Sequence, residues 1–185
     1  HDAPGLYSLL VSTGRLAFEL IHTLRDLGGL PGHPDVSTPK MITNTGSLGM
    51  GISKARGMAL AKRLDGHGGR VFVVMGDGEL QEGQVWESLQ PAANGQCAEI
   101  HVVIDHNKIQ SDTWVKDVSD LGTLEAKFAA YGWEVARCDG HDFAAIAEVF
   151  GHFSNVGDRP KVLIADTVKG KGVSFMETLG SEGED

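Results

Sequence analysis

The spacing of apolar residues along the chain predicts an α/β fold. A short apolar run rich in β-branched residues occupies positions 70–75, and its lack of alternation is typical of a strand buried on both faces of a parallel sheet. Further short runs at 100–104, 133–137 and 161–167 predict more strands. Segments between them carry apolar residues at three- and four-residue steps, the pattern of amphipathic helices. We therefore expect a mostly parallel sheet flanked by helices on both faces.

Glycine, proline and polar turn residues separate the helical segments. The spacing from 6 to 27 predicts one or two helices with a break at Gly14. Pro91 falls in the last turn of another helix, where proline weakens the pattern, and Asp142 is a typical N-cap residue. The remaining helices are predicted at 55–64, 82–93, 124–131 and 143–153, and the loops at 28–45, 114–123 and 169–172.

Composition narrows the class of protein. With 185 residues, of which 41% are hydrophobic, the chain is long enough for one good core, and we expect a single domain over residues 1–185. A formal net charge of −9 without a basic run argues against nucleic-acid or anionic-membrane partners. No apolar run approaches the ~20 residues of a membrane span. Two cysteines form no disulfide or zinc pattern, so a cytoplasmic protein is expected.

The most informative chemistry lies where the strand predicted at 70–75 ends. Gly76 and Gly78 flank Asp77, which places a carboxylate at the carboxyl end of a parallel strand, the usual ligand position in open α/β sheets. Glycines at such a turn leave room for backbone N–H groups to approach an anion. The turn therefore indicates a phosphate held through a hard divalent cation.

A second polar residue follows the next strand along the chain. The segment between Gly78 and Asn107 is long enough for one helix and a returning strand, which makes a βαβ crossover. Asp77 and Asn107 would then emerge side by side. Carboxylate, amide and carbonyl oxygens suit Mg²⁺ or Ca²⁺, and a diphosphate would have to supply part of the coordination shell.

Four motifs resemble the thiamine diphosphate-dependent transketolase family. They are MGDGELQEG at 75–83 with DHNKIQSD at 105–112, and, upstream, PGHPD at 31–35 and TGSLGMGIS at 45–53. The order is that of the family, and the resemblance covers nearly the whole chain. It implies the thiamine diphosphate-binding fold, with thiamine diphosphate and Mg²⁺ or Ca²⁺ as cofactors.

The resemblance also implies roles for individual residues. Asp77, Asn107 and the Ile109 carbonyl would hold the metal. The residues implied in cofactor binding are His1, Gly46, Leu48, Gly76, Asp77, Gly78, Asn107 and Ile109, and those implied in catalysis are His1, His33 and Glu82.

Three of these roles concern catalysis. His1 would lie over the reactive carbon of the cofactor, His33 would face the hydroxyl groups of the donor sugar, and Glu82 would reach across a dimer interface. Ser47 and Ser111 depart from the family, which usually has proline and an apolar residue there.

Other polar residues are predicted to have structural or solvent-exposed positions and no part in the site. We expect Glu79, Glu87 and Asp105 to be surface or turn residues, and His141 to support the turn of the Asp-Gly-His-Asp segment. Lys169 and Lys171 are expected to be solvated loop charges.

Only one half of a thiamine diphosphate site is implied by these motifs. In the family a second, pyrimidine-binding domain carries the glutamate that activates the cofactor. We expect the N-terminal part of a transketolase or, by preference, the separate subunit of a split one, in a homodimer or heterotetramer. The reaction implied transfers a two-carbon ketol unit from a ketose phosphate to an aldose.

Three other readings stay open. One is a related thiamine enzyme that acts on a 2-oxo acid, such as a deoxyxylulose phosphate synthase or a dehydrogenase E1 component. Another is a nucleotide-binding module, against which the absence of a G-x-G-x-x-G turn with a following ribose acid argues. The last is a non-catalytic relative that keeps the fold for interaction.

Overall fold

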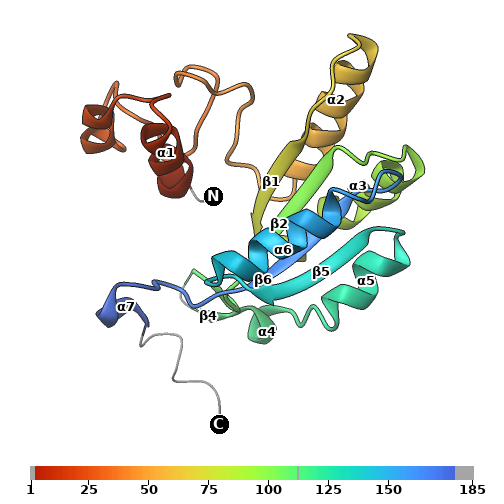
Figure 1. Cartoon of the computed structure of the whole chain (residues 1–185). Helices are drawn as coiled ribbons and strands as arrows, with labels where there is room; N and C mark the ends of the chain where they lie inside the picture. Colours follow the sequence, from red (N-terminus) through yellow and green to blue (C-terminus); the bar gives the residue numbers. More distant parts are fainter. Residues whose placement is uncertain (1–2, 112, 178–185) are drawn as a thin grey trace. The chain divides into compact units, whose positions relative to one another are not determined.

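The computed structural model describes residues 3–111 and 113–177. The chain forms two compact units, one from His1 to Leu48 and one from Gly49 to Asp185. The second unit contains the sheet (Figure 1). No helix among the described residues is long and apolar enough to cross a membrane.

A four-stranded parallel sheet forms the centre of the second unit. Its strands are β1 (Val71–Gly76), β2 (Ile100–His106), β5 (Glu134–Asp139) and β6 (Lys161–Asp166), in the order β1-β2-β6-β5. All three strand pairs are parallel, so the carboxyl ends share one edge. The register pairs Gly76 with Asp105 and His106 with Asp166, which brings the residues after β1 and β2 together.

Helices cover both faces of the sheet, as the apolar spacing predicted. The main core lies under α2 (Gly51–Leu64), α3 (Gly83–Asn94) and α5 (Leu124–Ala130), whose apolar side chains pack on Val102, Val162 and Ile164. The opposite side chains of β2, β5 and β6 pack against α6 (Phe143–Phe153). Asp142 is the N-cap residue of α6, and its carboxylate accepts hydrogen bonds from the N–H groups of Ala144 and Ala145.

The expectation that the first strand is buried on both faces is wrong. Val73 faces α2, but Phe72 and Val74 are 54% and 61% exposed. The reason is that β1 is an edge strand, and α6 covers the side of the sheet formed by β2, β6 and β5. The apolar run therefore predicted the strand correctly, but the prediction that both of its faces are buried is wrong.

Short elements near the carboxyl edge were not predicted. An antiparallel pair, β3 (Ile109–Gln110) with β4 (Thr113–Trp114), follows Asn107 directly, and α4 (Val115–Val118) follows β4. A further short helix, α7 (Ser174–Glu177), follows the loop after β6. Residues 114–118 of the segment predicted as a loop at 114–123 therefore belong to β4 and α4, and Trp114, Val115 and Lys116 line a pocket beside Asp77.

The first unit has its own small apolar cluster. It contains α1 (Ala3–Ser12) and a 3₁₀ helix, η1 (Phe18–Thr23), with a turn at Gly14 between them, where φ is +67°. Tyr7 and Leu30 are buried in the cluster, and the Tyr7 hydroxyl donates to the carbonyl of Pro31 at 2.7 Å. This arrangement agrees with the helical pattern and the break predicted for residues 6–27.

Candidate functional site

Asp77 is a buried carboxylate at the carboxyl end of β1. Its side chain is 2% exposed and accepts hydrogen bonds from two backbone N–H groups, Gly78 at 2.8 Å and Lys108 at 2.5 Å. Burial raises the pKa of Asp77, and the two backbone donors act in the opposite direction. The Lys108 donor comes from the turn after β2, so the structure joins the two loops that the sequence paired.

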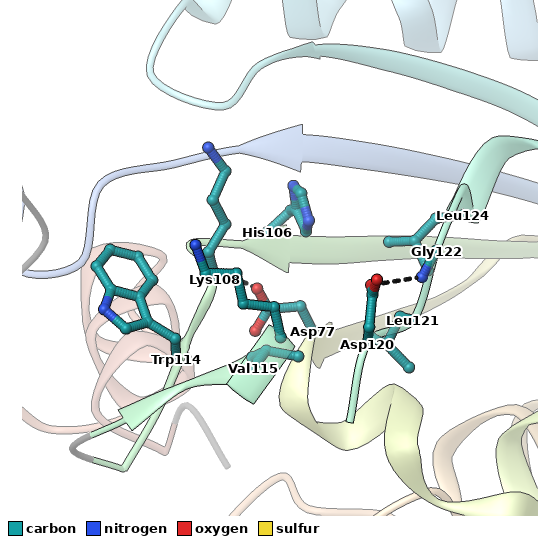
Figure 2. A pocket seen from close by; sticks show the side chains of 10 residues that line it. Asp77, His106, Lys108, Trp114, Val115, Asp120, Leu121, Gly122 and Leu124 are labelled. Carbon is teal, nitrogen blue, oxygen red and sulfur yellow. Dashed lines mark hydrogen bonds between the residues drawn. The ribbon is translucent and has the colours of Figure 1, made fainter. Parts of the chain in front are cut away.

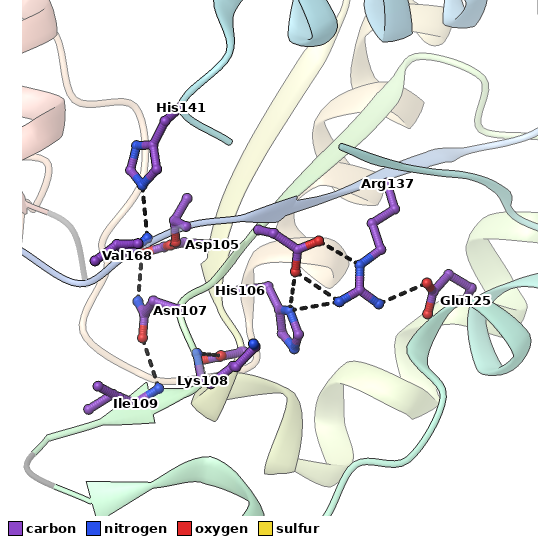
Figure 3. A network of polar contacts seen from close by, with 12 residues as sticks. Asp105, His106, Asn107, Lys108, Ile109, Glu125, Arg137, His141 and Val168 are labelled. Carbon is purple, nitrogen blue, oxygen red and sulfur yellow. Dashed lines mark hydrogen bonds and ion pairs between the residues drawn. The ribbon is translucent and has the colours of Figure 1, made fainter. Parts of the chain in front are cut away.

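Asn107 lies in that second loop with both ends of its amide engaged. Its Nδ2 donates to Asp105 at 2.9 Å, and its Oδ1 accepts from the backbone N–H of Ile109 at 2.9 Å (Figure 3). Lys108, the next residue, has a φ of +68°, a left-handed conformation that is uncommon for a side-chain-bearing residue. This strained turn directs its N–H at Asp77 and carries the chain into β3.

Gly78 is the glycine of the turn whose small size matters most. A Cβ there would lie 2.6 Å from Oε1 and 2.7 Å from Cβ of Gln110, a residue of β3. Nothing lies within 4 Å of a Cβ built on Gly76. The turn after β1 and the β3 strand after Asn107 are therefore in close contact, and Gly78 permits it.

A pocket of about 240 Å³ opens beside Asp77 (Figure 2). Its lining includes Lys108 and Lys116 and the ring of Trp114, with the Lys116 ammonium 5.8 Å from the ring centroid. The lining also contains Asp120, so two ammonium groups and two carboxylates surround the pocket. Asn107 and Ile109 are not among the residues that line it.

These oxygens fit a hard divalent cation that a ligand helps to hold. Within residues 3–111 and 113–177 no group of three or more His, Cys, Asp or Glu side chains could bind a metal. Asp77 would supply one carboxylate, and Asn107 and the Ile109 carbonyl would supply neutral oxygens. Mg²⁺ is commonly bound through one or two carboxylates with substrate phosphates completing its shell. The donor set fits a metal–diphosphate pair better than a metal alone.

A chain of ion pairs fixes the sheet edge next to this site. Oδ2 of Asp166 accepts from Arg137 Nε at 2.7 Å, and Oδ1 accepts from Arg137 Nη2 at 2.8 Å. His106 Nδ1 lies 2.8 Å from that same Oδ1. Arg137 also donates to Glu125 of α5 at 2.8 Å (Figure 3). The Arg137 guanidinium and then His106 lower the pKa of Asp166 to about 2. The ends of β2, β5 and β6 and the α5 helix are thus tied together.

Two carboxylates read as surface residues have defined partners. Glu79 is only 9% exposed, and its Oε1 accepts from the N–H of Gly49 at 2.8 Å. Asp105 accepts from Asn107, as above, and from the hydroxyl of Thr167. The prediction of Asp105 as a surface or turn residue is therefore wrong, because Asp105 lies in β2 and is partly buried. Glu79 does lie in the turn after β1, but it is buried there. Single carboxylates leave no periodic signal, although the position of Asp105 directly after a predicted strand was a usable clue.

Glu82 lies at the start of α3, where it is the N-cap residue without a side-chain cap bond, and it is exposed. Gly49 packs against it, since a Cβ on Gly49 would lie 3.0 Å from the Glu82 Cβ. The structure leaves its carboxylate accessible, and the role across an interface stays a prediction.

The first unit brings two other predicted residues together. Gly46, with φ +104°, lies against His33, since a Cβ on Gly46 would approach the His33 ring at 3.2 Å. Thr45 bonds to the Pro34 carbonyl through both its N–H and its hydroxyl. Leu48 is 40% exposed. His1 lies outside the described residues, so its proposed role stays a prediction.

Comparison with known sequences and structures points to one family. Residues 1–184 match the family described as "Transketolase, thiamine diphosphate binding domain". The 6-deoxy-6-sulfo-D-fructose transketolase subunit SqwG of Clostridium sp. strain MSTE9 is 37% identical over 179 residues, covering 96% of this chain and 65% of that protein. An apulose-4-phosphate transketolase subunit of Phocaeicola vulgatus is 34% identical over 180 residues, covering 97% and 64%. The chain thus spans less than two thirds of the length of these relatives.

Solved transketolases share the fold. A mutant transketolase from Pichia stipitis superposes with a TM-score of 0.84 at 31% identity, over 90% of this chain and 27% of that one. The transketolase of Campylobacter jejuni gives 0.75 at 28% identity, over 83% and 26%. The parallel sheet and its flanking helices are those of the thiamine diphosphate-binding fold.

Proposed function

The chain belongs to the thiamine diphosphate-binding domain family of transketolases, and we propose that it holds the diphosphate and metal half of a transketolase site. The observation that carries this proposal is the contact between the turns after β1 and β2. There, Asp77 is buried and bound to Lys108 N–H, next to Asn107. Mg²⁺, or Ca²⁺ in its place, would bind Asp77, Asn107 and the Ile109 carbonyl.

The cofactor, when bound, supplies the carbon centre that accepts the two-carbon ketol unit. The residues of this chain would bind and orient it. Asp77 and Asn107 hold the metal on the diphosphate, and Gly78 lets the turn after β1 pack closely against Gln110 of β3. His33 contacts the hydroxyl groups of the donor, and Glu82 contacts a partner subunit.

We propose that the partner is a pyrimidine-binding domain or subunit. Both relatives described above are named as transketolase subunits, and this chain matches about two thirds of each. By analogy with the family, we propose a ketose phosphate as donor and an aldose as acceptor. The two relatives are named for different sugars, 6-deoxy-6-sulfo-D-fructose and apulose 4-phosphate. The assembly would be a homodimer or heterotetramer in the cytoplasm.

Donor assays test the reaction class. The native protein, with the subunits that copurify with it, is given thiamine diphosphate and Mg²⁺ and then a ketose phosphate or pyruvate. We expect turnover with the ketose phosphate only, and turnover with pyruvate alone would favour the enzymes that act on 2-oxo acids. No turnover with either donor, despite bound cofactor, would favour a non-catalytic relative.

The His33→Ala variant tests the assignment of the donor contact. It should leave cofactor affinity unchanged and raise the donor KM or lower kcat/KM. A fall in cofactor affinity with unchanged donor kinetics would show that the role is wrong.

A further inference from the structure

Asn107 is held by side chains that the proposed function does not use. We propose that Asp105 and Thr167 are positioning residues, which fix the Asn107 amide so that its oxygen, and not its NH₂ group, faces the metal ion. The inference rests on the proposed function, because it concerns the ligand of that same metal.

The hydrogen-bond partners determine which way the amide faces. An ionised carboxylate can only accept hydrogen bonds, so Asp105 must face the Nδ2 group of Asn107, at 2.9 Å. Oδ1 then points to the backbone N–H of Ile109, at 2.9 Å, and keeps a second lone pair for a cation. A rotation of the amide by 180° would direct one N–H of the NH₂ group at the N–H of Ile109 and the other at the metal, and would place the oxygen against the Asp105 carboxylate. Asp105 therefore selects the ligating orientation.

Thr167 in turn fixes Asp105. Its hydroxyl donates to Oδ1 of Asp105, which leaves Oδ2 for Asn107. Thr167 follows β6 directly, and its N–H bonds to the carbonyl of His106 at 3.3 Å. A relay of hydrogen bonds therefore connects Thr167, after β6, to Asp105 in β2, and Asp105 to the proposed metal ligand Asn107.

The methyl group of Thr167 is packed as well. A Cβ on Gly140 would lie 2.5 Å from Thr167 Cγ2, so the turn after β5 leaves room for that methyl group and little else. Because the methyl and hydroxyl groups share one Cβ, packing the methyl group sets the direction of the hydroxyl. Asp105, Asn107 and Thr167 are all partly buried, which limits competition from water.

Outer partners of metal ligands commonly change metal affinity by about 10- to 100-fold when they are removed. The test measures Mg²⁺ titration at saturating thiamine diphosphate, by isothermal titration calorimetry, on the native protein with its copurifying subunits. Thr167→Val keeps the shape and removes the donor, and Asp105→Ala removes the acceptor. Each should weaken Mg²⁺ binding about 10-fold or more.

Variants that keep the hydrogen-bonding groups should bind Mg²⁺ more tightly than Thr167→Val and Asp105→Ala do. Asp105→Asn keeps an oxygen for Asn107 and should stay within about threefold of the native Mg²⁺ affinity. Thr167→Ser keeps the hydroxyl but loses the packed methyl group, so its Mg²⁺ affinity should fall between those of the native protein and Thr167→Val. Thr123→Val is the matched control, an exposed threonine without a side-chain cap bond. For the positioning variants, thiamine diphosphate affinity should return to the native value at high Mg²⁺.

Three results would overturn the inference, and they are distinguishable. If Thr167→Val and Asp105→Ala bind Mg²⁺ as the native protein does while Asn107→Ala does not, the relay is wrong and the metal site stands. If cofactor affinity falls equally at every Mg²⁺ concentration, the two residues have only a structural role. If the native protein shows no Mg²⁺-dependent cofactor binding, the proposed function fails with it. If Thr167→Val does not fold, the Mg²⁺ affinities of Asp105→Ala and Asp105→Asn still compare a variant that lacks the acceptor with one that keeps it.

Discussion

Replacing Asp166 by asparagine removes the charge that joins Arg137 to His106 at the sheet edge, and we expect it to lower the free energy of unfolding. The pKa of Asp166 is about 2 in the folded protein, against an ordinary value of 3.8, because Arg137 and His106 stabilise the carboxylate. A pKa lowered by folding adds stability that is complete above the unfolded value and is lost as the pH falls through the folded value.

The size of the effect follows from the shift and the exposure of the pair. A shift from 3.8 to about 2 corresponds to an upper bound of about 2.4 kcal/mol at 1.36 kcal/mol per pH unit. The Arg137 and Asp166 side chains are 38% and 39% exposed, so solvent screening reduces the expected loss to about 1 kcal/mol. Linkage predicts that about half of this difference remains at pH 3.

Urea unfolding followed by tryptophan fluorescence measures the difference. Trp86, Trp114 and Trp133 all belong to the second unit, which contains Asp166. Asp158→Asn is the control, since its partner is the adjacent Arg159 and its side chain is 61% exposed. If Asp166→Asn had the same free energy of unfolding as the native protein at pH 7, the Asp166 carboxylate would not stabilise the fold. The same conclusion would hold if the two proteins differed in free energy of unfolding by equal amounts at pH 7 and pH 3.

Other substitutions probe the core, a helix cap and the turn. Phe128→Ala removes a fully buried ring and should cost about 3–5 kcal/mol in urea unfolding, and a loss under about 1 kcal/mol would contradict the packing described. Asp142→Ala removes the cap of α6 and should cost about 1 kcal/mol, whereas unchanged stability would show that the cap adds nothing. Gly78→Ala should weaken thiamine diphosphate binding in a titration, because the new methyl group would meet Gln110, while Gly57→Ala has open space and should not. Equal affinity in both glycine variants would contradict the close contact.

Most of the fold could be predicted because buried strands and amphipathic helices leave periodic signals. The four strands of the parallel sheet, the helices α2, α3, α5 and α6, and the Asp142 cap all follow from such signals. Burial of the second face of β1 did not, because it depends on which strands α6 covers. The β3–β4 pair was missed because two-residue strands are too short to show any period.

The candidate site was predictable in part for a similar reason. Asp77 and Asn107 follow predicted strands, so parallel pairing alone brings their turns together. The partners of Asp105 and Glu79 were not predictable, because Thr167 and Gly49 lie far away along the chain. The left-handed Lys108 turn also leaves no sequence signal, since glycine is the residue expected there.

The metal assignment is the central claim, and one binding measurement tests it most directly. The affinity for thiamine diphosphate is measured with Mg²⁺ and with a chelator, in the native protein and in the Asp77→Ala and Asn107→Ala variants, with Asp158→Asn as control. We expect Mg²⁺-dependent binding of thiamine diphosphate in the native protein and in the control, and its loss in both site variants. The metal assignment would be wrong if either site variant bound thiamine diphosphate with the native affinity. It would also be wrong if the affinity of the native protein were the same with Mg²⁺ and with the chelator.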